Sequence, residues 1–330
     1  MSRAGRGAPY SVAVIVLWVG VLACAGWAAV RTLGLESGSP SVQLIAYTPF
    51  VALVAAGVLA VGLVLRRWFA AAIALLTVVA FAAAVLPRAV GDGQSAAEGG
   101  SKLTVMSANL LRGEADADEL VELVDRNGAD VLSVQELTPE AAAGLRQAGL
   151  HELLPNRVLN LRAGTATTGI YARQPLQRLG RASQGSSGVP SPQAVLQLAE
   201  GEPVELVAVH LTAPTRPTQI ERWRQGFGSL PPPDAQAPPR ILVGDFNATL
   251  DHDELRALLD SGYVDAAAAT GDGLVPTWRS GRLLLPPLTI DHVLVDPRVR
   301  VNAVAVNDIE GSDHRAVTVE LTIGPARPEP

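Results

Sequence analysis

The sequence is poor in sulfur: its 330 residues include one cysteine, Cys24, and two methionines. A single cysteine excludes an intramolecular disulfide framework, and so few sulfur ligands exclude a thiolate metal cluster. Any bound metal must therefore use oxygen or imidazole ligands. Aromatic residues are also scarce, at 4%, although 48% of the chain is apolar. This apolar content is enough for at least one substantial core, and the length allows two domains.

Lysine is almost absent as well, since Lys102 is the only one, and the net charge of −6 is unevenly divided. Residues 1–92 contain six arginines and two acidic residues, a net charge of +4, whereas the remaining 20 basic and 30 acidic residues give −10. Nucleic acids are bound mainly by cations that meet backbone phosphates. The net negative charge of residues 93–330 therefore disfavours nucleic acid as a partner, although Arg222 and Arg224 could form a small basic patch.

Three long uncharged runs lie in the first ninety residues, at 11–30, 41–65 and 68–86. Because a helix of about 20 residues crosses roughly 30 Å of hydrocarbon, each run predicts a transmembrane helix. A cleavable signal peptide is the alternative for the first run, but the run is too long and two more follow. No charge lies inside any run. The predicted three-helix bundle over 1–88 is therefore expected to anchor the protein in the lipid bilayer rather than transport ions.

The arginines beside these runs predict their orientation, because Lys and Arg are retained on the cytoplasmic side. Four arginines fall on one side and two on the other: Arg3, Arg6, Arg66 and Arg67 against Arg31 and Arg88. We therefore expect a multi-pass plasma-membrane protein with a cytoplasmic N-terminus. Everything after Arg88 is then expected to be extracytoplasmic.

A small, polar, Gly-rich segment at 89–101 is typical of a flexible linker. From 102 to 323, β-like runs and helix-like runs such as 116–128 predict an α/β domain, and 324–330 is expected to be a disordered tail. The predicted strands are 103–111, 130–137, 164–173, 194–200, 204–211, 240–246, 291–296 and 315–323.

Polar side chains stand where these predicted strands begin or end. They are Asn109, Glu136, His210, Asp245, Asn247, Asp291, His292, Asp313 and His314. Taken singly, each has a structural explanation, such as a turn cap or a satisfied core histidine. A buried unpaired carboxylate is costly, however, so their joint occurrence indicates convergence on a metal ion or an anionic reaction centre.

In their order along the chain, these motifs resemble the endonuclease/exonuclease/phosphatase superfamily over about residues 102–323. The motifs are SANLL, VQEL, AVHL, GDFNA, TW at Thr277–Trp278, IDHVL and SDHRAV. The resemblance implies a four-layer α/β sandwich, with two β-sheets face to face and helices outside. It also implies Mg²⁺-dependent hydrolysis of phosphoesters, with Mn²⁺ as an alternative ion. Relatives often have a Ser–Arg pair where this chain has Ala172–Arg173, and Arg173 is a candidate substrate contact.

Mg²⁺ prefers hard oxygen ligands and keeps several waters, so one or two carboxylates suffice to hold it. Glu136 is expected to be the principal ligand and Asp313 a second one. Asn109 is expected to orient the bound water or a phosphate oxygen.

Hydrolysis also needs an in-line water and a base that takes its proton. We expect Asp245 to be that base. Asn247 lies two residues on, on the same side of an extended segment, where it would fix the nucleophile or the phosphoryl group. His210 and His314 are suited to absorb the extra negative charge of the pentacovalent centre. The family pattern implies that Asp291 orients His314, which would raise the pKa of that imidazole.

The remaining polar and aromatic candidates are weaker. Trp278 would either line the rim of the substrate pocket or simply pack. His292 points to the other face of its strand and is expected to be structural. His252 is expected to be a solvated residue at a helix start, and His151 has no evident partner.

The whole architecture resembles the VanJ/StaP-type teicoplanin-resistance membrane proteins of actinobacteria. This resemblance implies dephosphorylation of undecaprenyl pyrophosphate at the outer face, which recycles the cell-wall lipid carrier. An anchored site also meets lipid phosphates or pyrophosphates at high effective concentration. The alternatives are an anchored nuclease, a nucleotide or phospholipid phosphodiesterase, and a non-enzymatic envelope protein, whose catalytic set should be incomplete. The sequence indicates no protein partner.

Overall fold

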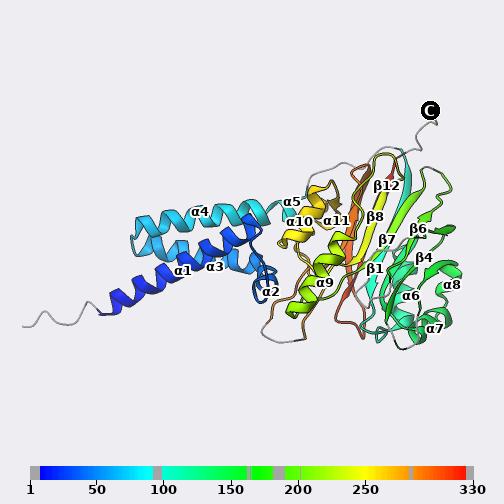
Figure 1. Ribbon diagram of the computed structural model, residues 1–330, viewed down its shortest axis with the longest axis horizontal. Helices are drawn as coiled ribbons and strands as arrows, with labels where there is room; N and C mark the ends of the chain where they lie inside the picture. Colours follow the sequence, from blue (N-terminus) through cyan, green and yellow to red (C-terminus); the bar gives the residue numbers. More distant parts are fainter. Residues whose placement is uncertain are drawn as a thin grey trace, which may run out of the picture. The chain divides into compact units, whose positions relative to one another are not determined.

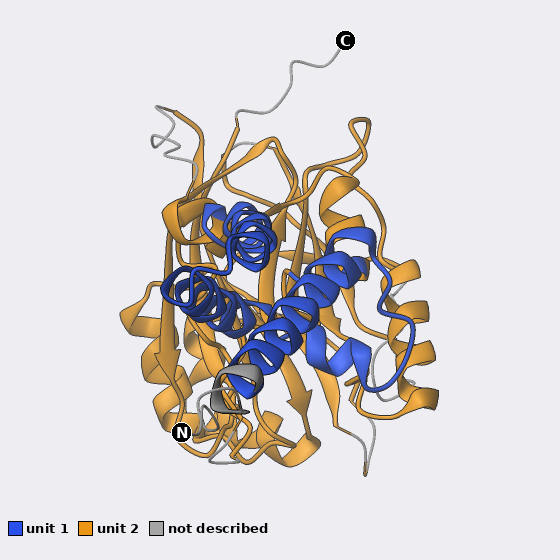
Figure 2. Ribbon diagram, turned by 90° about the vertical axis from the view of Figure 1, so that its left-hand side faces the viewer, with its two compact units in different colours: residues 1–87, 251–253 blue, residues 88–250, 254–330 orange. Residues whose placement is uncertain are grey.

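The computed structural model describes residues 8–91, 99–161, 164, 166–180, 190–200, 202–281 and 285–324, whose helices and strands are labelled in Figure 1. The chain divides into two compact units (Figure 2). Unit 1 comprises residues 1–87 and 251–253, and unit 2 comprises 88–250 and 254–330. Most of the expected linker, the tail beyond Gly324, and Arg3 and Arg6 lie outside the described residues.

Unit 1 consists of apolar helices. Two of its segments, Val12–Leu33 and Trp68–Val85, are long and apolar enough to cross a membrane. The helix expected over 41–65 is instead divided. Pro49, in the first turn of the second piece, has no N–H to continue a preceding helix, and that piece has only 17 residues. The helices are α1 (Ala8–Leu33), α2 (Ser41–Ile45), α3 (Thr48–Val64) and α4 (Trp68–Val85).

Small residues let the helices of unit 1 approach closely. A Cβ added at Gly62 of α3 would lie 3.4 Å from Ala71 of α4. His252, which we expected to be solvated, belongs to this unit and is buried. Its Nε2 lies 3.0 Å from the carbonyl oxygen of Val42, a residue 210 positions earlier. The prediction for His252 is therefore wrong, because a distant backbone carbonyl satisfies this ring.

In the described part of unit 2, two six-stranded sheets are present, with strand orders β11-β12-β1-β2-β4-β3 and β5-β6-β7-β8-β10-β9. The pairs β1–β2 and β7–β8 are parallel. The strands of the first sheet are β1 (Ser101–Asn109), β2 (Val131–Leu137), β3 (Asn156–Leu159), β4 (Thr167–Ala172), β11 (Val299–Asp308) and β12 (Arg315–Ile323). Those of the second are β5 (Leu176–Arg178), β6 (Gln193–Leu196), β7 (Val204–His210), β8 (Arg240–Asp245), β9 (Val264–Asp265) and β10 (Asp291–Val295).

The core of unit 2 lies between the two sheets. Val105 and Ile170 of the first sheet belong to one buried cluster with Leu206, Ile241 and Val243 of the second. Alternating side chains along each strand therefore divide between this core and an outer face. The prediction of a mixed α/β domain with two central sheets is confirmed.

Helices lie against the outer faces of the sheets. On the first sheet, Leu120 of α6 and Leu145 of α7 join a buried cluster with Met106 and Leu132. The helices of unit 2 are α5 (Pro87–Val90), α6 (Ala117–Arg126), α7 (Pro139–Gln147), α8 (Leu150–Leu153), α9 (Pro217–Gly228), α10 (Asp253–Asp260) and α11 (Ala266–Thr270).

Candidate active site

Four of the predicted site residues stand at or near the carboxyl ends of the parallel strands. Asn109, His210 and Asp245 end β1, β7 and β8, and Glu136 is the penultimate residue of β2. Parallel neighbours have their carboxyl ends at the same edge of a sheet. Asp291 joins this edge because it begins β10, which runs antiparallel to β8 with Asp291 opposite Asp245.

His314 and Asp313 reach the same edge from the other sheet. They precede β12, which is antiparallel to β1, so that Val317 lies opposite Ser107 near the end of β1. The Ser312 hydroxyl donates to the Asn109 carbonyl (2.7 Å) and holds this turn against β1.

Unusual backbone conformations orient two of the side chains, those of Glu136 and of Asp245, which follows Gly244. Glu136 has a φ of +55°, and the pairing of β2 with β4 shifts register between Val134 and Leu137. Strict alternation would have placed Glu136 on the outer face with Val134. Gly244 has a φ of +148°, and a Cβ there would lie 1.9 Å from the Val209 carbonyl oxygen. Only glycine can therefore occupy this position of the GDFNA motif.

Asp245 is the centre of the cluster. Its Oδ2 accepts from the side-chain amides of Asn109 (3.1 Å) and Asn247 (3.2 Å). The same oxygen lies 3.8 Å from Nε2 of His210 and 3.9 Å from Nε2 of His314. Burial, together with the charge of Asp291, raises the pKa of Asp245 to about 7. This carboxylate can therefore take up a proton near neutral pH.

His314 forms a hydrogen-bonded pair with Asp291. Its Nδ1 lies 2.9 Å from Oδ2 of Asp291, and both side chains are buried. Burial alone would lower the pKa of His314, but the charge of Asp291 and the hydrogen bond between them raise it to about 10. His314 is thus a cation at neutral pH. Thr277 fixes Asp291 in turn, because its hydroxyl oxygen accepts from the Asp291 backbone N–H (3.0 Å).

His210 faces the carboxylate of Glu136 at a longer distance. Its Nε2 is 3.7 Å from Oε1 of Glu136. Burial lowers the pKa of His210 to about 4, although the charge of Glu136 opposes this shift. The ring is therefore neutral at pH 7 and can donate one N–H, but it carries no positive charge.

Asp245, Asp291 and His314 offer ligand atoms within 4.8 Å of one another. The cationic imidazole of His314 already uses Nδ1 for Asp291, and a protonated imidazole does not bind a metal. These three residues are therefore better suited to hold and move protons than to bind a cation.

Asp313 and Glu136 fit a hard cation better. Oδ1 of Asp313 is buried without a hydrogen-bond partner among the described residues, which is a costly state for a carboxylate oxygen. Glu136 is the more exposed of the two acids around His210, and its Oε2 accepts from the Arg112 backbone N–H (2.8 Å). Carboxylate oxygens of this kind are the ligands that Mg²⁺ takes.

The two substrate-binding candidates lie in different places. Trp278 donates from Nε1 to Oδ2 of Asp313 (2.9 Å), so it reaches the cluster. Arg173 does not. It follows β4 at the start of β2, where Nε lies 3.2 Å from Oδ1 of Asp130. Asp130 is six residues, or about 20 Å, before Glu136 along the chain of β2. Because β4 runs antiparallel to β2, Arg173 leaves the sheet at the opposite edge.

Sequence reasoning assigned no role to Thr277 and Ser312. Both are supporting residues that hydrogen-bond to backbone groups of the cluster. Their signal was present, since Thr277 belongs to the TW motif and Ser312 to the SDH motif. The structural expectation for His292 agrees with its contacts, since its ring nitrogens lie 2.7 Å from Oδ2 of Asp265 and 2.9 Å from the Ala248 carbonyl oxygen.

Residues 106–314 match the sequence model of the Endonuclease/Exonuclease/phosphatase family. No curated protein matches the chain. Among solved structures, an endonuclease/exonuclease/phosphatase from Beutenbergia cavernae DSM 12333 is 16% identical with a TM-score of 0.52, over 68% of this chain and 72% of that one. D. rerio TDP2, complexed with a single-strand DNA product, is 18% identical with a TM-score of 0.53, over 67% of this chain and 99% of that one. A functionally unknown conserved protein from Enterococcus faecalis V583 is 16% identical with a TM-score of 0.51, over 67% and 99%. At these identities the three structures establish the shared fold.

Proposed function

Because the chain belongs to the endonuclease/exonuclease/phosphatase family, whose members are metal-dependent phosphoesterases and nucleases, we propose that it is a membrane-anchored, Mg²⁺-dependent phosphatase of a lipid pyrophosphate. Undecaprenyl pyrophosphate is the proposed substrate, and its dephosphorylation would recycle the cell-wall carrier and contribute to teicoplanin resistance. The observation that carries the reaction class is the single carboxylate, Asp245, between one cationic and one neutral imidazole.

The metal has a defined role in this proposal. Glu136 and Asp313 would hold it, and Asn109 would orient a water or phosphate oxygen beside it. When bound, a divalent ion supplies positive charge that stabilises phosphoryl oxygens and lowers the pKa of water.

Asp245 is the proposed general base. Its Oδ2 takes the proton of the attacking water, whose oxygen forms a bond to the terminal phosphorus. The bond from this phosphorus to the bridging oxygen breaks, inorganic phosphate forms, and the lipid monophosphate leaves. A pKa of about 7 suits this role, because the base is then partly ionised at neutral pH and still strong enough to accept a proton. The amides of Asn109 and Asn247 hold the carboxylate in place.

The two imidazoles would act on the phosphoryl group. His314, kept cationic by Asp291, can neutralise developing charge and donate a proton from Nε2 to the bridging oxygen. His210, which is neutral, can donate one hydrogen bond without adding charge. Trp278 positions Asp313 through its indole N–H.

The substrate class is supported by the apolar helices that share a chain with this site. Val12–Leu33 and Trp68–Val85 have the length and hydropathy of membrane spans. We propose that α3 is the third span, that the N-terminus is cytoplasmic and that the catalytic domain is extracytoplasmic. Anchoring in the bilayer would hold the site near lipid-linked phosphates.

A direct test compares substrates with the full-length protein in detergent micelles. We expect phosphate release from undecaprenyl pyrophosphate with Mg²⁺, little turnover of a phospholipid or DNA, and none with EDTA. Glu136→Gln should lose activity, whereas Glu140→Gln, on the exposed surface of α7, should retain it. Release that is unaffected by EDTA or by Glu136→Gln would refute the metal assignment. Activity of a C-terminally fused reporter enzyme that works only in the cytosol would refute the topology.

A membrane-anchored nuclease or nucleotide phosphodiesterase is the second candidate, favoured by the single-strand DNA product bound to the similarly folded D. rerio TDP2. The net negative charge of this chain disfavours a nucleic-acid substrate. Arg224, one of two arginines that could form a basic patch, pairs with Glu254 at 2.6 Å. Degradation of plasmid DNA by the Mg²⁺-loaded protein, lost in Asp245→Asn, would favour the nuclease.

A further inference from the structure

Two cavities lie against the outer face of the first sheet, away from the catalytic cluster. Their volumes are about 310 Å³ and 460 Å³, and both are lined by Ala142, Arg146 and Arg157. Tyr171, at the base of the smaller one, lies opposite Leu132 of β2. That position is four residues, or about 13 Å, before Glu136 along the strand. We call this pair of cavities the arginine pocket.

The arginine pocket is basic within an acidic domain. Arg146 comes from α7 and Arg157 from β3, and Arg178 of β5 lines the larger cavity. No acidic side chain is among the described residues that line either cavity. The guanidinium groups of Arg146 and Arg157 make no hydrogen bond or ion pair with any described residue. Two neighbouring cations without a counter-charge repel each other, so an anion between them would be stabilised.

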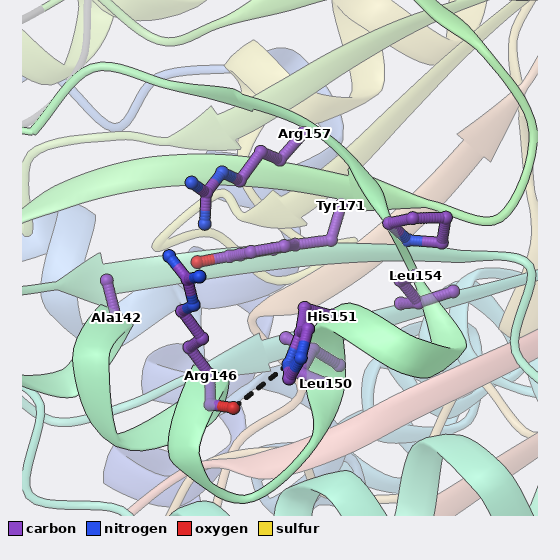
Figure 3. Close-up of a pocket in the computed structure, with 8 residues that line it drawn as sticks. Ala142, Arg146, Leu150, His151, Leu154, Arg157 and Tyr171 are labelled. Carbon is purple, nitrogen blue, oxygen red and sulfur yellow. Dashed lines mark hydrogen bonds between the residues drawn. The ribbon is translucent and has the colours of Figure 1, made fainter.

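Tyr171 supplies an independent indication of a ligand. The residue is 4% exposed, and its hydroxyl is buried without a hydrogen-bond partner among the described residues. Figure 3 shows this hydroxyl pointing toward the guanidinium groups of Arg146 and Arg157. Leaving a buried hydroxyl unpaired is costly. Burial raises the pKa of Tyr171 to about 12, although the charge of Arg157 opposes this, so the hydroxyl keeps its proton and can donate it.

We propose that the arginine pocket binds the phosphate group of a phosphate monoester, held by Arg146, Arg157 and the hydroxyl of Tyr171. Guanidinium forks match phosphate oxygens in bidentate geometry. Donors from three separate elements suit a tetrahedral oxyanion, which has more acceptor oxygens than a planar carboxylate. Leu150 and Leu154, which line the smaller cavity, provide an apolar surface for the organic part of the ester.

The arginine pocket is separate from the catalytic site, and its test does not depend on hydrolysis. Glycerol phosphate is titrated calorimetrically into the full-length protein in detergent with EDTA present. Arg146→Gln and Arg157→Gln should each weaken binding by about tenfold, since each removes a charge-assisted hydrogen-bond donor. Tyr171→Phe removes only the hydroxyl and should weaken binding by a few-fold, without lowering the thermal unfolding temperature of the free protein.

Arg126→Gln is the matched control. Arg126 is an exposed arginine on α6 that pairs with Glu122 and lines neither cavity. The Arg126→Gln variant should bind glycerol phosphate like the wild type, and all four variants should retain hydrolytic activity. Equal affinity in the wild type and the Arg146→Gln/Arg157→Gln double variant would overturn the site. Acetate competing as well as glycerol phosphate would overturn the choice of phosphate.

The phosphate can belong to a soluble ester or to a lipid headgroup. The same titration is therefore repeated in nanodiscs of phosphatidylcholine alone and of phosphatidylcholine with phosphatidate. If glycerol phosphate binds more weakly in the phosphatidate discs than in phosphatidylcholine alone, and only when the arginine pocket is intact, the source of the phosphate is a lipid headgroup. Unchanged affinity identifies a soluble ester. Absence of arginine-dependent binding in both kinds of disc and in detergent refutes the proposal.

Discussion

The imidazoles of His210 and His314 approach the same oxygen of Asp245 from different sheets, yet they have opposite charge states. Both rings are buried, and burial disfavours the charged form of each. His314 has a carboxylate oxygen 2.9 Å away on Asp291, whereas Oε1 of Glu136 lies 3.7 Å from His210. At His314 the charge of Asp291 and the hydrogen bond to it outweigh desolvation, whereas at His210 the charge of Glu136 does not, and the charge of His314 lowers the pKa of His210 further.

This difference gives one site two kinds of donor. A cation beside Asp245 can stabilise negative charge and donate a proton, while a neutral ring can donate a hydrogen bond without repelling a second cation. Two cationic imidazoles around one carboxylate would also oppose the binding of a metal ion. The asymmetry between the two sides can be tested by substitution.

The largest effect is expected for Asp245→Asn, which removes the carboxylate that both imidazoles share. The amide keeps the size of the side chain but cannot act as the base, so kcat should fall by about 10³-fold. Phosphate release from the lipid pyrophosphate measures this loss. Asp234→Asn, in the exposed segment before β8, serves as the control and should match the wild type. Activity within a few-fold of wild type in Asp245→Asn would rule out this residue as the base.

The next effect separates the two imidazoles directly. His314→Gln loses a cation and should lower kcat by about 10²-fold. His210→Gln retains a neutral donor and should lower it by about tenfold or less. Both variants are assayed for phosphate release at saturating substrate. The opposite order, with His210→Gln the more damaged enzyme, would contradict the assignment of charge.

A smaller loss is expected for Trp278→Phe on the His314 side of the site. The substitution removes the indole N–H that donates to Oδ2 of Asp313. Loss of one such hydrogen bond should cost a few-fold in activity and raise the Mg²⁺ concentration needed for half-maximal rate. Arg173→Gln, at the opposite edge of the sheet, should change neither quantity.

The positions of the main site residues could be predicted because strand patterning is local. An apolar run that ends in Asn109, His210 or Asp245 places that residue at the end of a buried strand, and the order of motifs indicates which ends belong together. The edge strand β11 also had a local signal, because VRVNAVAVND alternates valines with other residues. Sequence analysis did not use that signal.

Other features had no local signal. Arg173 ends a predicted strand, and Asn109 stands near the end of another, so only the antiparallel direction of β4 shows that Arg173 leaves the sheet at the opposite edge. The arginine pocket combines Arg146, Arg157 and Tyr171 from three elements, and no spacing along the chain connects them. The neutral state of His210 depends on distances between strands that a sequence does not specify.

The smallest effect concerns stability rather than activity, and it extends the comparison to a third buried histidine. His292 resembles His314, because its Nδ1 lies 2.7 Å from Oδ2 of Asp265. Burial alone would lower the pKa of His292, but the charge of Asp265 and the hydrogen bond raise it above its ordinary value. The folded state therefore binds the proton more tightly than the unfolded chain. This contribution to stability is fully present below about pH 6.5, the ordinary pKa of histidine, and is lost as the pH rises through the folded value.

The free energy of unfolding of the wild type, measured by chemical denaturation relative to His292→Gln from pH 5.5 upward, isolates this contribution from the other titrating groups. The stabilisation should shrink with rising pH, with a slope no steeper than about 1.4 kcal/mol per pH unit for one proton. His210→Gln should show the opposite trend relative to the wild type, because burial lowers the pKa of His210 and its proton is bound more tightly in the unfolded chain. If both differences changed in the same direction, the distance to a carboxylate would not be what sets the charge of these rings.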